Sequence, residues 1–124
     1  MSEPSAILIV EDDEDLRELL RFNFESNNFD VTACSDGGEA LEFLRQADNL
    51  PDVIVLDLLM PEVDGLEFLR RRADTEQLVE IPTIILTGLD DEETLEEAYK
   101  LGVDDYVTKP FSPNALITRV NHLH

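Results

Sequence analysis

The sequence predicts an α/β domain in which helices cover both faces of a doubly wound parallel sheet. Three short runs, AILIV, DVIVLDL and PTIILT, are continuous in Ile, Leu and Val rather than alternating, as in strands covered on both faces. Segments with helical periodicity lie between them. Alternation of this kind is typical of a parallel sheet whose ligand site lies beyond the carboxyl ends of the strands.

Five strands and five helices are expected to alternate along the chain. The strands are residues 6–10, 29–34, 52–58, 82–87 and 104–108, of which 29–34 and 104–108 are the weaker patterns, nearer the sheet edges. The helices are residues 14–26, 37–47, 64–73, 91–102 and 112–123. Gly102 is expected to end the fourth helix, and Ser112 followed by Pro113 to begin the fifth.

Each helical segment offers one apolar face to the sheet. The apolar positions recur at intervals of three or four residues: Leu16, Leu19, Leu20 and Phe24 in the first helix, and Ala40, Leu41 and Leu44 in the second. The segments DGLEFLRRRA, DEETLEEAYKLG and SPNALITRVNHL follow the same pattern. All five helices are therefore expected to pack on the sheet.

Length and charge exclude several classes of protein. The 124 residues fit one domain, 1–124, with a single core. A net charge of -20 argues against nucleic-acid binding, because phosphate repels such a surface. No apolar run approaches the ~20 residues of a membrane helix, and the N-terminus lacks the features of a signal peptide. We expect a cytoplasmic protein with no membrane partner, in which the single Cys34 is a buried filler.

Polar side chains follow the carboxyl ends of four predicted strands. Glu11 and Asp12 follow the first strand, Asp57 lies at the end of the third, Thr87 ends the fourth, and Lys109 follows the fifth. Because parallel strands end at the same edge of a sheet, these groups should converge. Clustered carboxylates repel one another, and a hard divalent cation relieves the repulsion, so Mg²⁺ is the expected cofactor.

A simpler interpretation exists for some of these residues. The acidic run 11–15 fits a solvated helix N-terminus, where negative charge is favoured, and Asp13 to Asp15 are expected to be no more than that. Taken alone, Thr87 fits an ordinary strand end and Lys109 a solvated lysine. Asp57 is different, because it closes the apolar run VIVL and its burial would be costly without a cation or partner.

Four motifs together resemble a known family. VEDD, DLLMPEVDG, LTG and DDYVTKPF are similar to the motifs of response-regulator receiver domains of two-component signalling, from Ala6 to about Leu123. The resemblance implies a flavodoxin-like five-stranded sheet of order 2-1-3-4-5. It also implies that Asp57 is the phosphoacceptor and that Asp12 binds Mg²⁺ directly. Glu11 would support the metal partly through water, and the backbone carbonyl of Leu59 would be a third protein ligand.

The resemblance further implies the remaining roles. Lys109 would pair with one phosphoryl oxygen and Thr87 would hydrogen-bond another. The Tyr106 ring would then turn inward and move the surface formed by the fourth helix, the fifth strand and the fifth helix. The Lys109–Pro110 peptide is expected to be cis. The partner would be a sensor histidine kinase or a histidine phosphotransfer protein. The domain would be a phosphoacceptor rather than an enzyme, although it assists its own phosphorylation and dephosphorylation.

Three other functions fit the sequence less well. A phosphohydrolase with an aspartyl-phosphate intermediate usually has a second carboxylate two positions after the nucleophile, where this chain has Leu59. A receiver-like binding module with an inactive site is disfavoured because every charged site position is filled. A nucleotide-binding domain is disfavoured because no Gly-rich loop follows the first strand. Tyr106 also fits a half-buried edge-strand tyrosine whose hydroxyl reaches water.

The resemblance leaves the output undecided. We expect the chain to be either the regulatory piece of a larger protein, with a downstream output domain or partner, or a stand-alone phosphorelay shuttle. Receivers of the winged-helix transcription-factor class pair cations of the fourth helix with acids near the fifth strand. Asp104, Asp105 and Arg119 match that pattern, but the fourth helix offers Leu95, Glu96 and Glu97 where cations would be needed. Dimerisation through this face is therefore expected to be weak.

Overall fold

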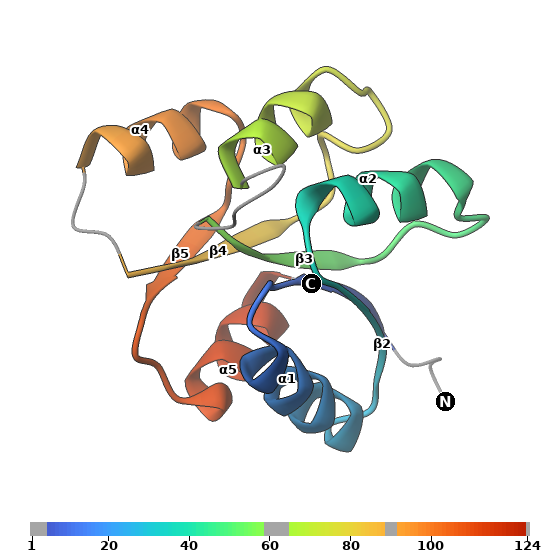
Figure 1. The fold of residues 1–124 in the computed structure, drawn as a ribbon, viewed down its shortest axis with the longest axis vertical. Coiled ribbons are helices and arrows are strands. Elements are labelled where there is room, and N and C mark those ends of the chain that lie inside the picture. The colour runs from blue at the N-terminus through green and yellow to red at the C-terminus, as the bar shows by residue number, and fades with distance from the viewer. Residues whose placement is uncertain (1–4, 59–64, 89–91, 124) are drawn as a thin grey trace.

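The computed structural model describes residues 5–58, 65–88 and 92–123 (Figure 1). Its strands are β1 (Ser5–Val10), β2 (Phe29–Cys34), β3 (Val53–Asp57), β4 (Thr83–Thr87) and β5 (Asp105–Thr108). Its helices are α1 (Glu14–Ser26), α2 (Gly37–Gln46), α3 (Gly65–Ala73), α4 (Glu92–Lys100) and α5 (Pro113–Leu123). All ten predicted elements are present, most within one or two residues of their expected ends.

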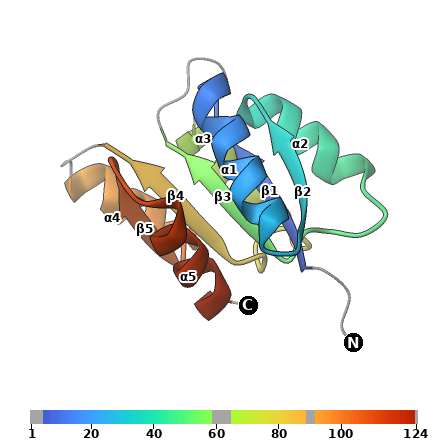
Figure 2. The same cartoon turned by 90° about the horizontal axis from the view of Figure 1, so that it is seen from below.

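The five strands form one parallel sheet of order β2-β1-β3-β4-β5, which Figure 2 shows across its width. The chain adds β2 on one side of β1 and then crosses to add β3 on the other side. This reversal of direction places the carboxyl ends of β1 and β3 next to each other, and ligand sites of doubly wound sheets lie at such a point. The predicted fold class and strand order are confirmed.

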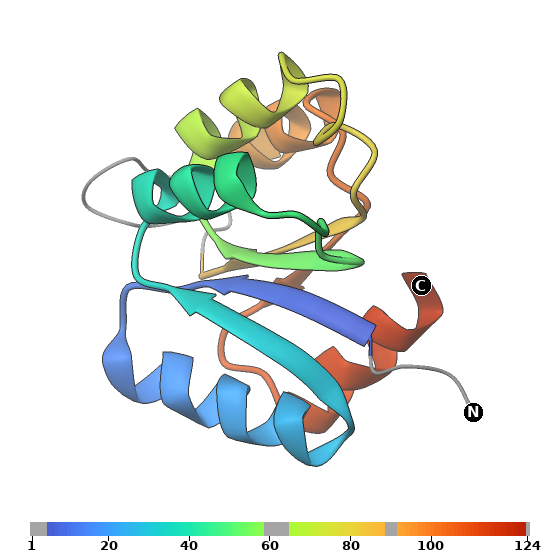
Figure 3. The same ribbon diagram turned by 90° about the vertical axis from the view of Figure 1, so that its right-hand side faces the viewer.

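Helices cover both faces of the sheet, as Figure 3 shows from the side. Helices α1 and α5 lie on one face, and α2, α3 and α4 lie on the other. Successive strand side chains point to opposite faces, so each face needs its own apolar set. In β1, Ile7 and Ile9 pack toward α1 and α5, whereas Leu8 and Val10 pack in the other cluster. This is why the strand runs are continuous in apolar residues.

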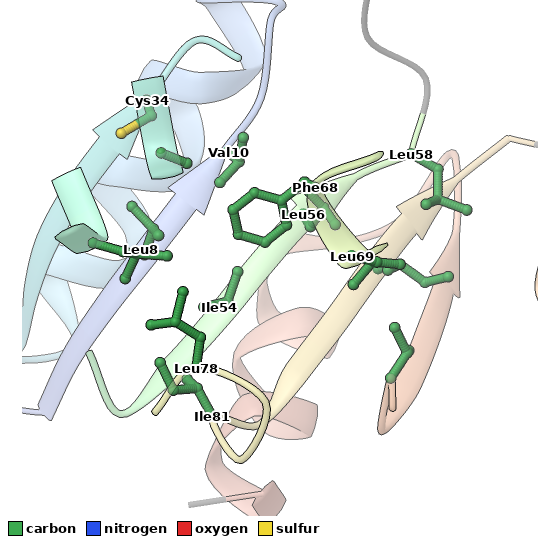
Figure 4. Close-up of a cluster of buried hydrophobic side chains, with 14 of the residues drawn as sticks. Leu8, Val10, Cys34, Ile54, Leu56, Leu58, Phe68, Leu69, Leu78 and Ile81 are labelled. Carbon is green, nitrogen blue, oxygen red and sulfur yellow. The ribbon is translucent and has the colours of Figure 1, made fainter. Parts of the chain in front are cut away.

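The cluster beneath α2, α3 and α4 is built around the middle strands (Figure 4). Ile54 and Leu56 of β3 are completely buried there, and Phe68 of α3 lies over them with no exposed surface. Leu78 and Ile81 belong to the same cluster although they lie in the turn segment between α3 and β4. No helix or strand was predicted for this segment, and the burial of its leucine and isoleucine was not predicted either.

Local signals fix the helix ends. The Asp13 carboxylate accepts hydrogen bonds from the backbone N–H groups of Asp15 and Leu16, so Asp13 is the N-cap of α1, at the helix N-terminus that was expected there. Gly102, at φ 97°, follows α4, and the Val103 N–H donates to the Ala98 carbonyl at 3.2 Å. This left-handed glycine ends the helix as predicted. The Ser112 hydroxyl accepts from the Ala115 N–H at the start of α5.

Two further expectations concern single residues and the membrane. Cys34 is buried, and desolvation raises the pKa of its thiol to about 12, with nearby Glu39 adding to the effect. It is thus a filler of the core, as predicted. Within residues 5–58, 65–88 and 92–123, none of the helices has the length and apolarity that crossing a membrane requires.

Candidate functional site

Two carboxylates meet at the carboxyl edge of the sheet. Val10 of β1 lies in register with Leu56 of β3, so the residues that follow them, Glu11 and Asp57, are neighbours. The Glu11 N–H donates to the Cys34 carbonyl at 3.0 Å, which extends the β1–β2 ladder by one residue. Glu11 is completely buried and Asp57 is only 2% exposed. Acidic side chains are almost never this buried without a compensating group.

The compensating group within the described chain is Lys109. Its Nζ lies 3.2 Å from Asp57 Oδ2 and 3.6 Å from Glu11 Oε1. The Lys109 N–H donates to the Thr87 carbonyl at 2.8 Å, which ties the segment after β5 to the end of β4. The Lys109–Pro110 peptide is cis, as predicted. The ammonium therefore points into the same edge of the sheet as the acids.

One ammonium does not neutralise this cluster. Burial raises the pKa of Glu11 from 4.5 to about 8, and the hydrogen bond with Asp57 and its negative charge add to the rise. Partial burial lowers the pKa of Lys109, but the charges of Asp57 and Glu11 outweigh that effect and hold it above its ordinary value. Glu11 Oε1 is buried and has no hydrogen-bond partner among the described residues. The site has more negative charge than its own groups balance.

A third carboxylate completes a set that fits a divalent cation. Oxygen atoms of Glu11, Asp12 and Asp57 all lie within 4.8 Å of one another. Asp12 is exposed, so the set is open to solvent on one side. Oxygen-only ligands and an open side suit Mg²⁺, which keeps several waters. Glu11 Oε1 lies 3.6 Å from Lys109 Nζ but accepts no hydrogen bond from a described residue, and this is the observation that favours a cation here. The predicted Leu59 carbonyl lies outside the described residues.

The two predicted switch residues lie on the neighbouring strands. Thr87 ends β4, is completely buried, and pairs in register with Thr108 of β5. Tyr106 is half-buried on β5, where its ring contacts the exposed Tyr99 of α4 edge-on at a centroid distance of 6.3 Å. Tyr106 pairs with Ile85, two residues before Thr87 along β4. The fold thus gathers the carboxylates of Glu11, Asp12 and Asp57, places Lys109 beside Glu11 and Asp57, and leaves Tyr106 farther from the sheet edge.

Two residues that support the site were not predicted. Arg17 of α1 donates from Nη1 to the Glu11 carbonyl at 3.0 Å, which fixes the segment between β1 and α1. A Cβ atom on Gly65 would lie 2.6 Å from Leu58 Cα and 2.9 Å from the Asp57 carbonyl oxygen. Only glycine lets α3 begin so close to the end of β3. The sequence contains no signal for the arginine contact, whereas the glycine after an aspartate was a signal for a close turn.

Comparison with known proteins gives consistent results. The family model described as the response regulator receiver domain matches residues 7–121. The chain is 40% identical over 114 residues to the alkaline phosphatase synthesis transcriptional regulatory protein PhoP of Bacillus subtilis, covering 92% of this chain and 46% of that protein. It is 39% identical over 117 residues to the response regulator SaeR of Staphylococcus aureus, covering 94% and 49%. The chain thus spans about half the length of these relatives.

Solved structures with the same fold include two receivers. The receiver domain of the Francisella response regulator 1452 has a TM-score of 0.85 at 41% identity, over 96% of this chain and 95% of that one. The chemotaxis protein CheY4 of Vibrio cholerae has a TM-score of 0.90 at 26% identity, over 98% and 99%. Both likenesses cover nearly the whole of each chain.

Proposed function

Because the chain belongs to the response-regulator receiver family of two-component signalling, whose members act as phosphoacceptors, we propose that Asp57 is its phosphoacceptor. The observation that carries this proposal is the pair of buried acids, Glu11 and Asp57, held 3.6 and 3.2 Å from one ammonium at the carboxyl edge of the sheet. Asp57 ends a fully buried strand after four apolar residues, and burying a carboxylate there is costly unless it has a function.

The proposed reaction is a transfer between two side chains. A carboxylate oxygen of Asp57 attacks the phosphorus of a phosphohistidine, the P–N bond breaks, and the electron pair returns to the imidazole, which takes up a proton. Lys109 Nζ already lies 3.2 Å from Asp57 Oδ2, so it is placed to hold the carboxylate that receives the phosphoryl group. Its positive charge offsets the charge that develops on the phosphoryl oxygens.

Glu11, Asp12 and Asp57 would hold Mg²⁺, together with the carbonyl of Leu59. The cation, when bound, supplies positive charge beside the phosphoryl oxygens. The role of this chain is to supply the ligand set: burial fixes Glu11, and the Arg17 contact fixes the backbone that carries it. Without a divalent cation, an incoming phosphoryl group meets carboxylates whose repulsion one ammonium does not balance, so transfer should nearly stop.

The proposed switch uses Thr87 and Tyr106. The Thr87 hydroxyl would move toward a phosphoryl oxygen, and the Tyr106 ring would turn into the space beside β4. Thr87 is buried at the end of β4, and the half-buried Tyr106 lies on the adjacent strand. The contact between Tyr106 and Tyr99 would transmit this movement to α4.

The proposed donor is a phosphohistidine on a sensor kinase or a histidine phosphotransfer protein. An apolar groove lined by Leu16, Leu19, Phe111 and Pro113 lies beside Lys109, between α1 and the start of α5. Leu19 is 47% exposed at this groove, where it could contact a helix that carries the donor histidine. Leu19→Glu should slow transfer from a phosphorylated histidine phosphotransfer protein without slowing phosphorylation by acetyl phosphate, which needs no groove.

Intact-mass spectrometry tests the phosphoacceptor directly. With Mg²⁺ and acetyl phosphate, the protein should gain one phosphoryl group, and Asp57→Asn should gain none. Asp30→Asn is the matched control, because Asp30 is exposed and pairs with Ala6 at the opposite end of the strands. Phosphorylation of the Asp57→Asn protein under the same conditions would refute the assignment.

A further inference from the structure

Helix α3 carries three successive arginines, Arg70, Arg71 and Arg72, in a chain with only nine Lys and Arg residues. Their environments differ. Arg71 Nε pairs with Glu67 Oε2 of the same helix at 3.2 Å. Arg72 turns inward and is 1% exposed. Arg70 Nη2 reaches Glu97 Oε2 of α4 at 2.8 Å. Two of the three arginines therefore join α3 to the segments around α4.

Arg72 holds the carboxyl end of α4. Its guanidinium donates to the Leu101 carbonyl, directly after α4, at 3.2 Å. It also donates to the carbonyls of Val79 at 3.0 Å and Ile81 at 2.6 Å, in the segment before β4. A Cβ atom on Gly102 would lie 3.3 Å from Arg72 Nη1, so the turn that ends α4 packs directly on the guanidinium. This end of α4 is fixed by a buried group.

Few side chains of α4 are buried. Ala98 is the only side chain buried in the helix, and Leu95 is packed only partly against the core. The ion pair of Glu97 with Arg70 is exposed, at 41% and 48% of the two side chains. Tyr99 is 43% exposed and contacts Tyr106 edge-on. A helix with one buried residue is a low-stability element, and small contacts decide its position.

We propose that the Arg70–Glu97 ion pair is an inhibitory contact that favours the position of α4 seen here over the position that α4 takes when Asp57 is phosphorylated. The Arg72–Leu101 hydrogen bond keeps the carboxyl end of the helix in place while the remainder moves. This inference rests on the proposed function, because it takes the Asp57–Thr87–Tyr106 system as the input that moves α4.

The ion pair also gives α4 a second link to the phosphorylation site. Helix α3 begins at Gly65, whose backbone lies against Leu58 and the Asp57 carbonyl, and it ends at the arginines. The link through Thr87 and Tyr106 reaches α4 from the sheet, whereas α3 reaches it from the neighbouring helix. A contact made in only one of two states shifts the equilibrium by its differential free energy, and linkage makes the effect reciprocal.

The expected size follows from the exposure of the pair. Exposed ion pairs contribute 0.2–1 kcal/mol in double-mutant cycles, so losing this one should strengthen the binding of a phosphoryl mimic about 1.5- to 5-fold. The mimic is beryllofluoride with Mg²⁺, titrated by calorimetry. Arg70→Gln and Glu97→Gln should both bind it more tightly. These substitutions change the net charge in opposite directions, so a common direction of effect excludes a general charge effect.

Two further variants complete the design. Arg71→Gln removes the same charge from the same helix but breaks only the pair within α3, and it should bind beryllofluoride as the unmodified protein does. The exchanged protein Arg70→Glu with Glu97→Arg restores the pair and should return the affinity to the original value. Unchanged or weaker binding of beryllofluoride by both single variants would overturn the proposal. So would a double variant, Arg70→Glu with Glu97→Arg, whose affinity does not return to the original value.

Amide hydrogen exchange of the metal-free protein gives a second readout that does not depend on ligand. The amides of α4 should exchange faster in Arg70→Gln and Glu97→Gln than in Arg71→Gln, while those of Leu101 to Val103, beside Arg72, should not change. Equal exchange of α4 in all three variants would contradict the inference. If Asp57→Asn still binds beryllofluoride, the assignment of Asp57 as the phosphoacceptor is wrong. The hydrogen-exchange rates of α4 still test the effect of the ion pair on the helix, because they are measured without the ligand.

Discussion

Lys109 Nζ lies 3.2 Å from Asp57 Oδ2, although 52 residues of sequence separate them. The contact exists because β3 and β5 flank β4 and all three strands end at one edge of the sheet. It places the positive charge beside the carboxylate before any phosphoryl group arrives, so little reorganisation is needed during transfer.

Lys109→Met should slow phosphorylation by acetyl phosphate at least about ten-fold, because a preorganised charge at a developing anion is worth at least that much. Lys100→Met is the control, since Lys100 is the other lysine of the chain and lies exposed at the end of α4. The rates are measured by intact mass at fixed Mg²⁺. Equal slowing in both variants would show a general charge effect in place of a role at the site.

The contribution of Glu11 to the stability of the metal-free protein should fall as the pH rises from about 4.5 to about 8. The native state raises the pKa of Glu11 to about 8, so it binds the Glu11 proton more tightly than the unfolded state does. The stabilisation is complete below pH 4.5 and is lost as the pH rises through this window. The Glu11→Gln variant lacks this titrating proton. The free energy of unfolding of the variant minus that of the original protein should therefore increase as the pH rises.

Urea unfolding in EDTA measures this difference, and the same series with Mg²⁺ tests the metal. Metal binding needs ionised ligands, so Mg²⁺ should stabilise the original protein more at pH 8 than at pH 5 and should stabilise Glu11→Gln less. If the difference in free energy of unfolding between the two proteins in EDTA stays constant across the pH range, Glu11 is not the source of the pH dependence.

Arg72→Met should destabilise the domain by about 3 kcal/mol, because three backbone carbonyls lose their buried donor. Arg71→Met removes an exposed arginine from the next position and should change the free energy of unfolding by less than about 0.5 kcal/mol. Urea unfolding at pH 7 compares the two. A similar loss of unfolding free energy in both variants would show that the hydrogen bonds of Arg72 to the three carbonyls are not the cause.

The phosphorylated or beryllofluoride-loaded domain should associate weakly through the face formed by α4, β5 and α5. Arg119 is engaged by Asp105 of the same chain at 2.8 Å, and Glu97 by Arg70. Glu96 is exposed on α4. Sedimentation at moderate salt should find mainly monomer, and Glu96→Lys should increase association. A tight symmetric dimer of the unmodified sequence on this face would contradict the prediction.

The sequence by itself determined the elements and the chemistry of the sheet edge. Strands buried on both faces need continuous apolar runs, so β1, β3 and β4 were visible, and Gly102 and Ser112 marked helix ends through local backbone hydrogen bonds. Because parallel strands end at one edge, the residues after them could be grouped without coordinates. That argument brought Glu11, Asp57 and Lys109 together correctly.

Only the tertiary structure decided which partners are contacted by adjacent residues of the same chemical type. Glu11 is buried and Asp12 exposed, although both are acids in one run. Arg70, Arg71 and Arg72 are identical and adjacent, yet one pairs across to α4, one within α3, and one lies in the core. Successive residues of a helix point about 100° apart, so their partners are set by distant segments that the fold brings alongside. No local pattern encodes those neighbours.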